Sequence, residues 1–431
     1  MKKVLFLSAF LLMLFAFNGM ASDDIINVGL YYGNSVLQVA DLSSDEGLIF
    51  PDSEEEIGSE ITAKFNAEDN TIELYEYGTD DMLFKTEADI PISICGADEI
   101  TKLNNKRYRG VITLYPSYEG ITIINEVNIE DYLYGVVPKE ASASWPEEAL
   151  KAQAVAARTY VFSALNGKHS DYGFDVCSTT DCQVYGGYDS EAESTNKAVD
   201  ETAGIIAIYD GKAVHTLFSA GNGGWAEDSK NVWGGTYPYL TTFKDEYEDS
   251  DNIKGLVWTV SVTPEEIAKG IAKYGGDVGD VTGMEITEKS ESGRILKLKI
   301  TGTKGSFIIE KDKARSFLGL RSSLYTITPP SPLLMAATAL GKTEISSPTY
   351  ALTADGMKKV SSSMHVITSE KVQKVSASSD GTYTLNGRGY GHGVGMSQWG
   401  AYCMSEEGFT YDEILKYYYK NITLGTTEDL K

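Results

Sequence analysis

Residues 136–160, VVPKEASASWPEEALKAQAVAARTY, join a β-rich region to the first clear helix of the chain. Leucine and alanine residues recur at helical spacing through the second half of this stretch. Ser144 and Glu147 precede that pattern three residues apart, as the two ends of a capping box do. The stretch therefore predicts a helix that begins near Ser144, preceded by a loop that contains Glu140.

The regions on either side alternate between strand and helix patterns. Residues 26–127 contain runs typical of strands, among them VGLYY, EITAKF, TIELYEY, YRGVITLY and ITIINEV. Downstream we expect a helix within 191–202, a hairpin turn at Asp210-Gly211, a helix at 264–274 and strands at 295–301 and 305–310. The predicted fold is α+β, with a β-rich N-terminal part packed on a helix-containing catalytic core.

The N-terminus is typical of a secretory signal peptide. Lys2 and Lys3 precede an apolar run over residues 4–17, and small residues end at Ala21. We expect residues 1–21 to be removed, and no later segment is apolar enough to span a membrane. The mature chain is therefore expected to be secreted or held at the cell wall.

Composition divides the mature chain into four further segments. Residues 22–120 are the β-rich part and 121–330 the catalytic core, up to a proline-rich break at 328–332. Residues 331–379 have weak periodicity and are an insertion of uncertain order. Residues 380–425 return to strand, glycine-rich and helical patterns, with a second capping box at Thr410 and Glu413, and are expected to complete the core.

The charge of the chain excludes one class of partner. A net charge of -25 argues against nucleic acid, because neutralising phosphates requires clustered lysine and arginine. Acidic clusters at 52–56 and 245–249 are predicted to be solvated surface rather than calcium sites, since no EF-hand loop is present.

Five separated motifs resemble one family. They are VNIEDYLYGVVPKE…WPEEALKAQAVAARTYV (127–161), DVCSTTDCQVYGG (175–187), LFSAGNGG (217–224), RSFLGLRS (315–322) and GYGHGVGMSQWGA (389–401). In this order they resemble the SpoIID (stage II sporulation protein D) family and the related amidase-enhancer (LytB-type) proteins. The resemblance implies lytic transglycosylase chemistry on peptidoglycan glycan strands that lack stem peptides.

Glu140 matches the family's single catalytic glutamate, which acts first as acid and then as base. Its apolar neighbours would raise the carboxyl pKa, whereas a helix start at Ser144 would lower it. Four other acids compete for the role, and each also has a structural interpretation such as stabilising a helix start. These four are Glu130, Asp131, Glu147 and Glu148.

Further residues of the motifs are candidates for substrate contact: Arg158, Ser219, Asn222, His392 and Gln398. A structural ion pair is an equal alternative for Arg158, and His392 could instead be a satisfied core histidine. A glycan cleft also needs aromatic platforms, and five residues could supply them although most aromatic side chains are core. They are Tyr132, Trp145, Tyr185, Trp225 and Trp399.

Cys177 and Cys182 allow three interpretations. Some relatives bind zinc through cysteine and a histidine that precedes the second cysteine, but this chain has Asp181 there. Together with His169, these residues could form a structural zinc site without an open coordination position. A disulfide suits the oxidising compartment, and free thiols are the third alternative.

The sequence therefore favours an exported enzyme whose partner is the peptidoglycan glycan. A second interpretation is a non-catalytic wall-binding protein that activates a cell-wall amidase, as the amidase-enhancer branch of the family is thought to do.

Overall fold

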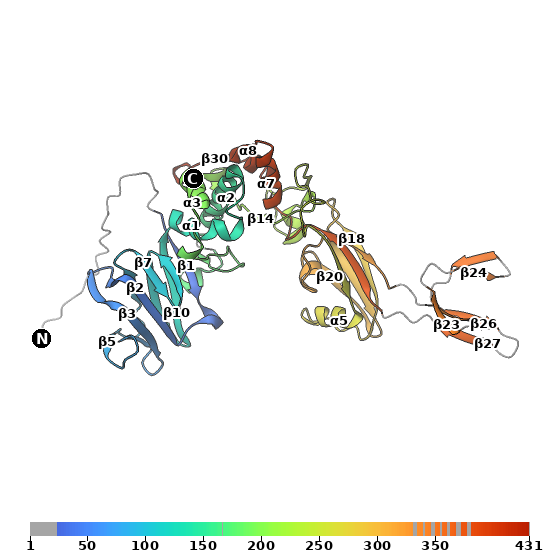
Figure 1. Cartoon of the computed structure of the whole chain (residues 1–431), viewed down its shortest axis with the longest axis horizontal. Coiled ribbons are helices and arrows are strands. Elements are labelled where there is room, and N and C mark those ends of the chain that lie inside the picture. Colours follow the sequence, from blue (N-terminus) through green and yellow to red (C-terminus); the bar gives the residue numbers. More distant parts are fainter. Residues whose placement is uncertain are drawn as a thin grey trace. The chain divides into compact units, whose positions relative to one another are not determined.

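The computed structural model describes residues 24–165, 167–330, 334–338, 341–345, 350–353, 356–359, 363–367, 372–376 and 381–430. The predicted signal peptide lies outside these residues. The chain forms two compact units, the first made of residues up to 136 with 166–191 and 199–205, and the second of the remainder. Both helices and strands are abundant, which confirms the α+β prediction (Figure 1). No helix of the described residues is both long and apolar enough to cross a membrane.

The first unit is built on one sheet of eleven strands, ordered β11-β1-β10-β9-β6-β2-β3-β4-β5, with β7 pairing with β2 and β8. All neighbours are antiparallel except β1 and β11. The strands are β1 (Ile25–Tyr31), β2 (Val39–Phe50), β3 (Glu55–Asn66), β4 (Thr71–Glu76), β5 (Met82–Lys85), β6 (Ile92–Gly96), β7 (Ile100–Leu103), β8 (Lys106–Arg109), β9 (Val111–Ser117), β10 (Gly120–Asn128) and β11 (Val176–Cys177).

Each of the strand runs named from the sequence lies in this sheet. The pattern missed β2, because the polar segment 43–47 interrupts its alternation of apolar and polar residues. In the structure the pairing of β2 with β3 shifts register between Ser43 and Leu48, so the irregular segment is accommodated without ending the strand.

Two helices follow the sheet. Helix α1 spans Ile129–Glu140 and α2 spans Glu147–Ala164. The prediction of a loop at Glu140 was therefore wrong, because Glu140 is the last residue of α1. The sequence concealed this helix because Pro138, a helix breaker, lies inside it.

The capping box predicted at Ser144 is also wrong. Pro146 is the N-cap residue of α2 and makes no side-chain cap, while the Ser144 hydroxyl pairs with that of Ser142 at 3.0 Å. The helix begins after this proline, whose ring restricts φ, here -57°, and whose ψ of 144° is not helical.

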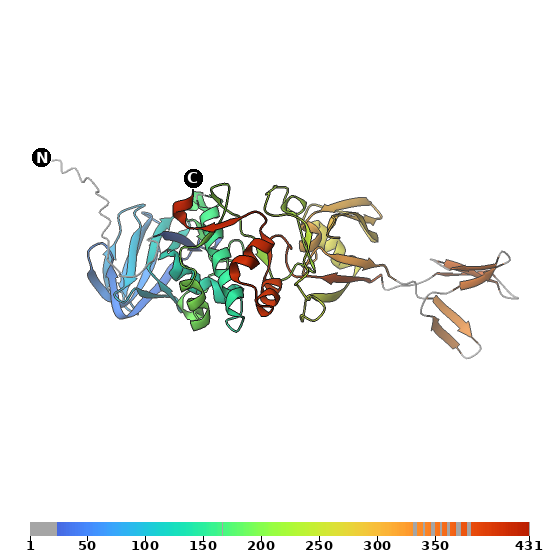
Figure 2. The same ribbon diagram turned by 90° about the horizontal axis from the view of Figure 1, so that it is seen from above.

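The second unit contains α2 and several shorter helices. Its further helices are α4 (Ser229–Val232), α5 (Pro264–Ala272), α6 (Lys313–Ser316), α7 (Gln398–Glu406) and α8 (Tyr411–Tyr418). Helix α3 (Glu193–Asp200) lies partly in each unit. Helices α7 and α8 pack against α2, whose alanines allow close approach (Figures 1 and 2). The predicted helices at 191–202 and 264–274 are confirmed as α3 and α5, and the capping box of Thr410 and Glu413 opens α8 as predicted.

Small sheets complete this part of the second unit. They are formed by β12 (Ile206–Tyr209), β13 (Lys212–Ala213), β14 (Phe218–Ser219), β15 (Trp225–Ala226), β16 (Phe243–Lys244), β29 (Met396–Ser397) and β30 (Thr423–Gly425). Strands β12 and β13 are joined by the predicted two-residue turn, in which Asp210 and Gly211 have φ values of 51° and 72°. Both values are positive, as a type I′ turn requires.

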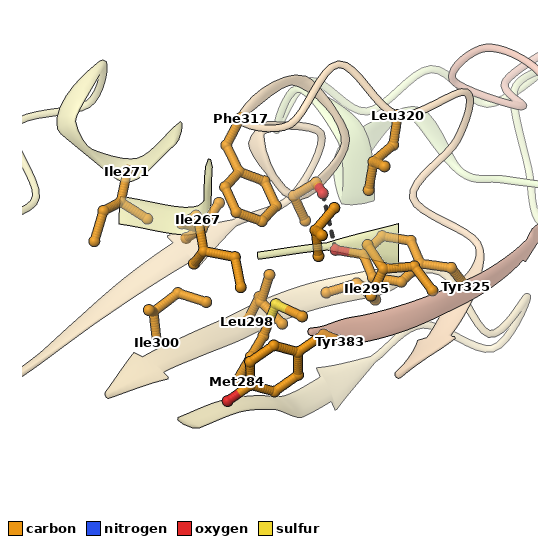
Figure 3. Close-up of a cluster of buried hydrophobic side chains, with 14 of the residues drawn as sticks. Ile267, Ile271, Met284, Ile295, Leu298, Ile300, Phe317, Leu320, Tyr325 and Tyr383 are labelled. Atoms are coloured by element: carbon orange, nitrogen blue, oxygen red, sulfur yellow. Dashed lines mark hydrogen bonds between the residues drawn. The ribbon is translucent and has the colours of Figure 1, made fainter. Parts of the chain in front are cut away.

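A separate hydrophobic core lies in the same unit. It is enclosed by α5, α6 and two three-stranded sheets, ordered β17-β28-β21 and β18-β19-β20. These strands are β17 (Val257–Val262), β18 (Val281–Lys289), β19 (Ile295–Gly302), β20 (Gly305–Glu310), β21 (Tyr325–Thr328) and β28 (Tyr383–Arg388). Figure 3 shows its packed side chains and the hydrogen bond from the Tyr325 hydroxyl to the Ala314 carbonyl, at 2.9 Å. The strands predicted at 295–301 and 305–310 are β19 and β20.

The segment predicted as an insertion leaves and re-enters this core at neighbouring strands, because β21 pairs with β28. Its described residues form three hairpins. They are β22 (Leu334–Thr338) with β23 (Gly341–Ile345), β24 (Tyr350–Thr353) with β25 (Gly356–Lys359), and β26 (Ser363–Ile367) with β27 (Val372–Ser376).

A buried and an exposed residue of the same sheet allow a matched test of this core. Leu298 on β19 is 0% exposed, whereas Ile308 on β20 is 51% exposed. We expect Leu298→Ala to lower the free energy of unfolding by about 2–5 kcal/mol, because it removes packed methyl groups and leaves a cavity. Ile308→Ala should change it by no more than about 0.5 kcal/mol. Urea unfolding followed by circular dichroism measures both, and equal losses would contradict the assigned core.

Candidate functional site

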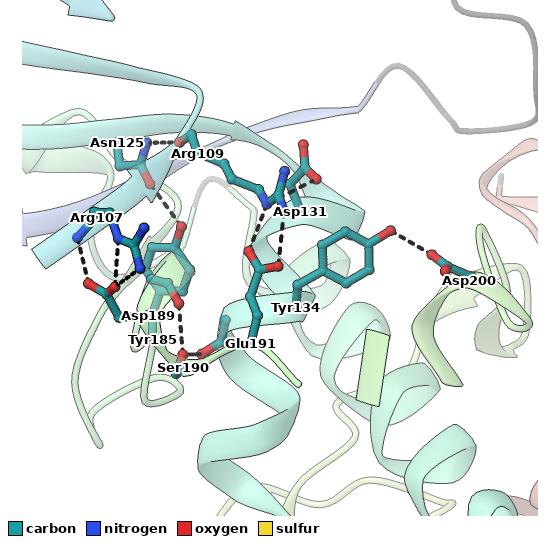
Figure 4. A network of polar contacts seen from close by, with 12 residues as sticks. Arg107, Arg109, Asn125, Asp131, Tyr134, Tyr185, Asp189, Ser190, Glu191 and Asp200 are labelled. Carbon is teal, nitrogen blue, oxygen red and sulfur yellow. Dashed lines mark hydrogen bonds and ion pairs between the residues drawn. The ribbon is translucent and has the colours of Figure 1, made fainter. Parts of the chain in front are cut away.

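The site is built around the C-terminal end of α1. In the first unit, polar contacts anchor the opening turns of this helix (Figure 4). The Arg109 guanidinium binds Glu191 in a bidentate pair at 2.7 and 3.0 Å and lies 3.8 Å from Asp131. The Tyr134 hydroxyl donates to Asp200 at 2.5 Å. These contacts hold the first turns of α1 within the first unit.

Glu140 itself is partly buried. In the second unit, its backbone carbonyl accepts a hydrogen bond from Gln398 Nε2 at 3.1 Å. The same Nε2 donates to Gln153 Oε1 on α2 at 3.2 Å, and both glutamines are buried. A carbonyl at a helix C-terminus has no partner within the helix, so this amide satisfies it and ties the end of α1 to α2 and α7.

The four competing acids each serve a structural contact. Glu130 accepts from the Gly204 amide at 2.9 Å, and Asp131 lies beside Arg109. Burial raises the pKa of Asp131, and the nearby guanidinium opposes this rise.

The two acids that open α2 form surface ion pairs. Glu147 pairs with Lys151 and Lys197 at 2.7 and 2.8 Å. Glu148 pairs with Lys151 at 3.0 Å and accepts from the Tyr411 amide at 2.7 Å. Their contacts agree with the structural interpretation of both residues.

Two glycine-rich motifs meet beside α7. Strands β14 and β29 pair in parallel, with Ser219 opposite Ser397, and Gly221 and Tyr390 exchange backbone hydrogen bonds at 3.1 and 2.8 Å. Gly391 has a φ of 111°, and a Cβ there would lie 2.5 Å from the Ser219 Cβ. The glycine therefore permits this close backbone approach, as the sequence predicted.

A buried carboxylate holds these motifs together. Glu248 is 7% exposed and accepts from the Asn222 and Gly223 amides at 2.5 and 2.8 Å, and from the hydroxyls of Ser250 and Ser397, the latter at 2.6 Å. Ser397 in turn is the N-cap of α7 and accepts from the Gly400 amide at 3.0 Å. The carboxylate thus fixes the start of the helix that presents Gln398.

Sequence reasoning missed this role of Glu248. The cluster 245–249 was predicted to be solvated, yet Asp245 and Glu248 are both buried. Asp245 accepts from the Asn222 side chain at 2.6 Å and from the Tyr418 hydroxyl at 2.8 Å. The cluster 52–56 is exposed, as predicted.

The predicted contact residues all lie in the second unit, but most face inward. Arg158 is 0% exposed within α2, which favours its structural alternative. Asn222 is also 0% exposed, and both ends of its amide are used within the protein, by Asp245 and the Gly224 amide. Ser219 is 8% exposed. Gln398 donates a hydrogen bond to the Glu140 carbonyl.

His392 is partly buried and lies edge-on to Trp233, with ring centroids 4.9 Å apart. Its Nδ1 accepts from the Val394 amide at 3.0 Å. Desolvation lowers the pKa of His392 to about 4, so the imidazole is neutral near pH 7. A neutral ring that accepts from its own loop agrees with the core alternative raised from the sequence.

The first unit gathers the four residues predicted as metal ligands. Donor atoms of His169, Cys177, Asp181 and Cys182 all lie within 4.8 Å of one another. The cysteines are not bonded to each other. The hydrogen bond between their sulfurs lowers the pKa of Cys177 to about 4 and raises that of Cys182.

His169 and Asp181 complete the cluster. His169 Nε2 is buried without a hydrogen-bond partner among the described residues and lies 3.4 Å from Asp181 Oδ2. The same Asp181 oxygen is 2.8 Å from Lys168 Nζ. An orphaned imidazole nitrogen beside two sulfurs is a donor set that suits zinc.

Two family models match parts of the chain. The family model described as "Stage II sporulation protein" matches residues 117–209, and a domain of unknown function matches 239–341, where most of the β17–β21 core lies. An uncharacterized protein of Brachyspira hyodysenteriae is 34% identical over 322 residues, covering 75% of this chain and 73% of its own length.

Two named relatives come from Bacillus subtilis. The chain is 32% identical to an amidase enhancer, covering 68% of this chain and 40% of that protein, and 26% identical to stage II sporulation protein D, covering 71% and 76%. Together with the family model, these matches show the family of the chain. It belongs to the SpoIID/LytB family, that of stage II sporulation protein D and the amidase enhancer.

We call the buried Glu248 carboxylate, with the amides and hydroxyls that donate to it, the Glu248 clamp. Its contacts lead to a second stability prediction. Glu248→Ala leaves two amides and two hydroxyls without their buried acceptor, so we expect the free energy of unfolding to fall by about 3 kcal/mol or more. The neighbouring Glu246 is exposed. Glu246→Ala should therefore cost no more than about 0.5 kcal/mol. Chemical unfolding checks both variants, and a Glu248→Ala protein as stable as the native one would refute the clamp.

Proposed function

We propose that the chain cleaves the glycan strands of peptidoglycan as a lytic transglycosylase, with Glu140 as the catalytic acid and base. The observation that carries the proposal is the placement of Glu140. It ends α1 in the motif that the family model matches, and Gln398 of the distant glycine-rich motif hydrogen-bonds to its carbonyl. Two motifs far apart in sequence thus meet at the backbone of Glu140.

The proposed chemistry needs only this one carboxyl group. The Glu140 carboxylic acid gives its proton to the glycosidic oxygen as the bond from that oxygen to the muramic acid C1 breaks. The carboxylate then takes the proton of the 6-hydroxyl of the same sugar, whose oxygen bonds to C1. The products are an anhydro-muramic end and a free 4-hydroxyl, and the carboxylic acid is restored. A hydrolytic glycosidase would use a second carboxylate.

Replacing the carboxyl group tests this role. We expect Glu140→Gln to release anhydro-muramic ends from stem-peptide-free glycan at least about 100-fold more slowly, because the amide cannot exchange the proton. Mass spectrometry of the digest measures the ends.

Glu147→Gln is the matched control. It makes the same change at an acid whose partners are partly exposed lysines, so activity should stay within about twofold. Native protein that binds glycan but releases no anhydro-muramic ends would refute the enzyme proposal.

That result would favour the second candidate, a wall-binding protein that enhances an amidase. The relative named amidase enhancer supports this candidate, although the chain spans only 40% of that protein. In this case the protein should accelerate a purified cell-wall amidase on intact wall, and Glu140→Gln should leave the acceleration unchanged. Both candidates place the protein outside the cytoplasm, at the cell wall.

We also propose a structural zinc ion held by Cys177, Cys182, His169 and Asp181. Donors about 2.0–2.3 Å from a tetrahedral zinc lie about 3.3–3.8 Å apart, so the 4.8 Å cluster needs only a small contraction. Four protein ligands leave no open position, so the metal would tie segment 169–182 together and take no part in the reaction.

Metal analysis tests this site. We expect about one zinc per native chain by plasma mass spectrometry, a stoichiometry set by one tetrahedral site. Cys177→Ser should lose the metal and lower the thermal midpoint, whereas Cys403→Ser, on α7, should keep both. Zinc-free native protein would contradict the proposal, and thiol titration would then distinguish a Cys177–Cys182 disulfide from free thiols.

A further inference from the structure

The five aromatic residues predicted as possible sugar platforms differ in exposure and in ring contacts. Tyr132 and Tyr185 are 0% and 4% exposed, so neither presents a ring face to a ligand. Trp145 and Trp399 are only partly buried and contact each other, with centroids 5.0 Å apart and planes inclined at 48°. Trp225 is partly buried too, but it has no described ring contact with them.

A third ring joins the pair. Tyr402 follows Trp399 by three residues on α7, so the two side chains lie on the same face of the helix. Its ring meets Trp399 at 5.3 Å and Trp145 at 5.4 Å, edge-on in both cases. We call Trp145, Trp399 and Tyr402 the aromatic triad.

Two connections along the chain link the triad to Glu140. Trp145 follows Glu140 by five residues and packs against the buried core formed by Ala141, Leu150 and Ala198. Trp399 directly follows Gln398, the residue that donates to the Glu140 carbonyl. The Glu248 contact that fixes the start of α7 therefore also positions the helix that carries Trp399 and Tyr402.

The chemistry of the triad suits a neutral sugar. No cation–π contact of the described residues lies on these rings, and neither indole Nε1 donates a hydrogen bond to a described residue. Neither Nε1 is a buried atom without a partner, so both N–H groups reach solvent and can donate to a ligand oxygen. The C–H face of a pyranose can stack on an indole ring while its hydroxyl or acetamido oxygen accepts from the N–H.

We propose that the aromatic triad is a binding platform for a sugar ring of the glycan strand, adjacent to Glu140. The inference rests on the proposed function in taking glycan as the ligand, but it concerns binding and does not require cleavage. Full burial is what a purely structural role would predict, as for Tyr418 and Tyr419 in the same unit, which are both 0% exposed. The triad instead combines a packed inner side with partly exposed rings.

Binding measured in a Glu140→Gln background separates the platform from catalysis. The probe is purified stem-peptide-free glycan, and co-sedimentation gives its affinity. We expect Trp399→Ala to weaken binding about tenfold, the loss of one good stacking contact. Trp399→Phe should recover most of the affinity. Tyr118→Ala, which removes a 91% exposed ring from the first unit, should leave affinity unchanged.

A second measurement covers the case in which Trp399→Ala does not fold. Saturating glycan should shift or quench the tryptophan emission of the Glu140→Gln protein, and Trp145→Phe and Trp399→Phe should each remove part of that change. Bound glycan without an emission change, or equal affinity in folded Trp399→Ala, would overturn the platform. Absence of any glycan binding would also overturn it.

The failures of the two proposals are distinguishable. If native protein releases no anhydro-muramic ends while the triad variants still lose glycan binding, the enzyme proposal fails and the platform stands. If native protein cleaves glycan and the variants bind and cleave normally, only the platform fails.

Discussion

The buried carboxylate of Glu248 is the contact on which the arrangement of the site depends. It accepts hydrogen bonds from the Asn222 and Gly223 amides and from Ser397, which is also the N-cap of α7. A buried carboxylate is costly unless such donors surround it, so the three segments are stable only when they come together. Once α7 begins at this point, Gln398 and Trp399 take their places beside the end of α1.

The helix pair α1 and α2 supplies the other half of the site. The proline within α1 and the proline before α2 leave a short connection that carries both Glu140 and Trp145 at its borders. The alanines of α2 let α7 approach, which brings Gln153 within hydrogen-bond distance of Gln398. Close packing of these small residues therefore helps to place Gln398, which donates to the carbonyl of the candidate acid.

Much of this molecule followed from local patterns. Strand alternation located β3, β4, β9 and β10, and turn chemistry located the Asp210-Gly211 hairpin. The family motifs pointed to Glu140 and to the cysteine cluster. Local rules failed at the Ser144 capping box, where Pro146 is the N-cap residue of α2 and Ser144 pairs with Ser142. They also failed at α1, where the helix tolerates Pro138.

The sequence by itself determined the fold class, the family and the candidate acid, because these depend on periodicity and on ordered motifs along the chain. Only the tertiary structure decided which of the candidate polar and aromatic residues are buried and which form one partly exposed group. Arg158, Asn222 and Glu248 are buried, while Trp145, Trp399 and Tyr402 form a partly exposed group. Burial is a property of residues brought together from distant segments, and neither residue type nor spacing along one segment specifies it.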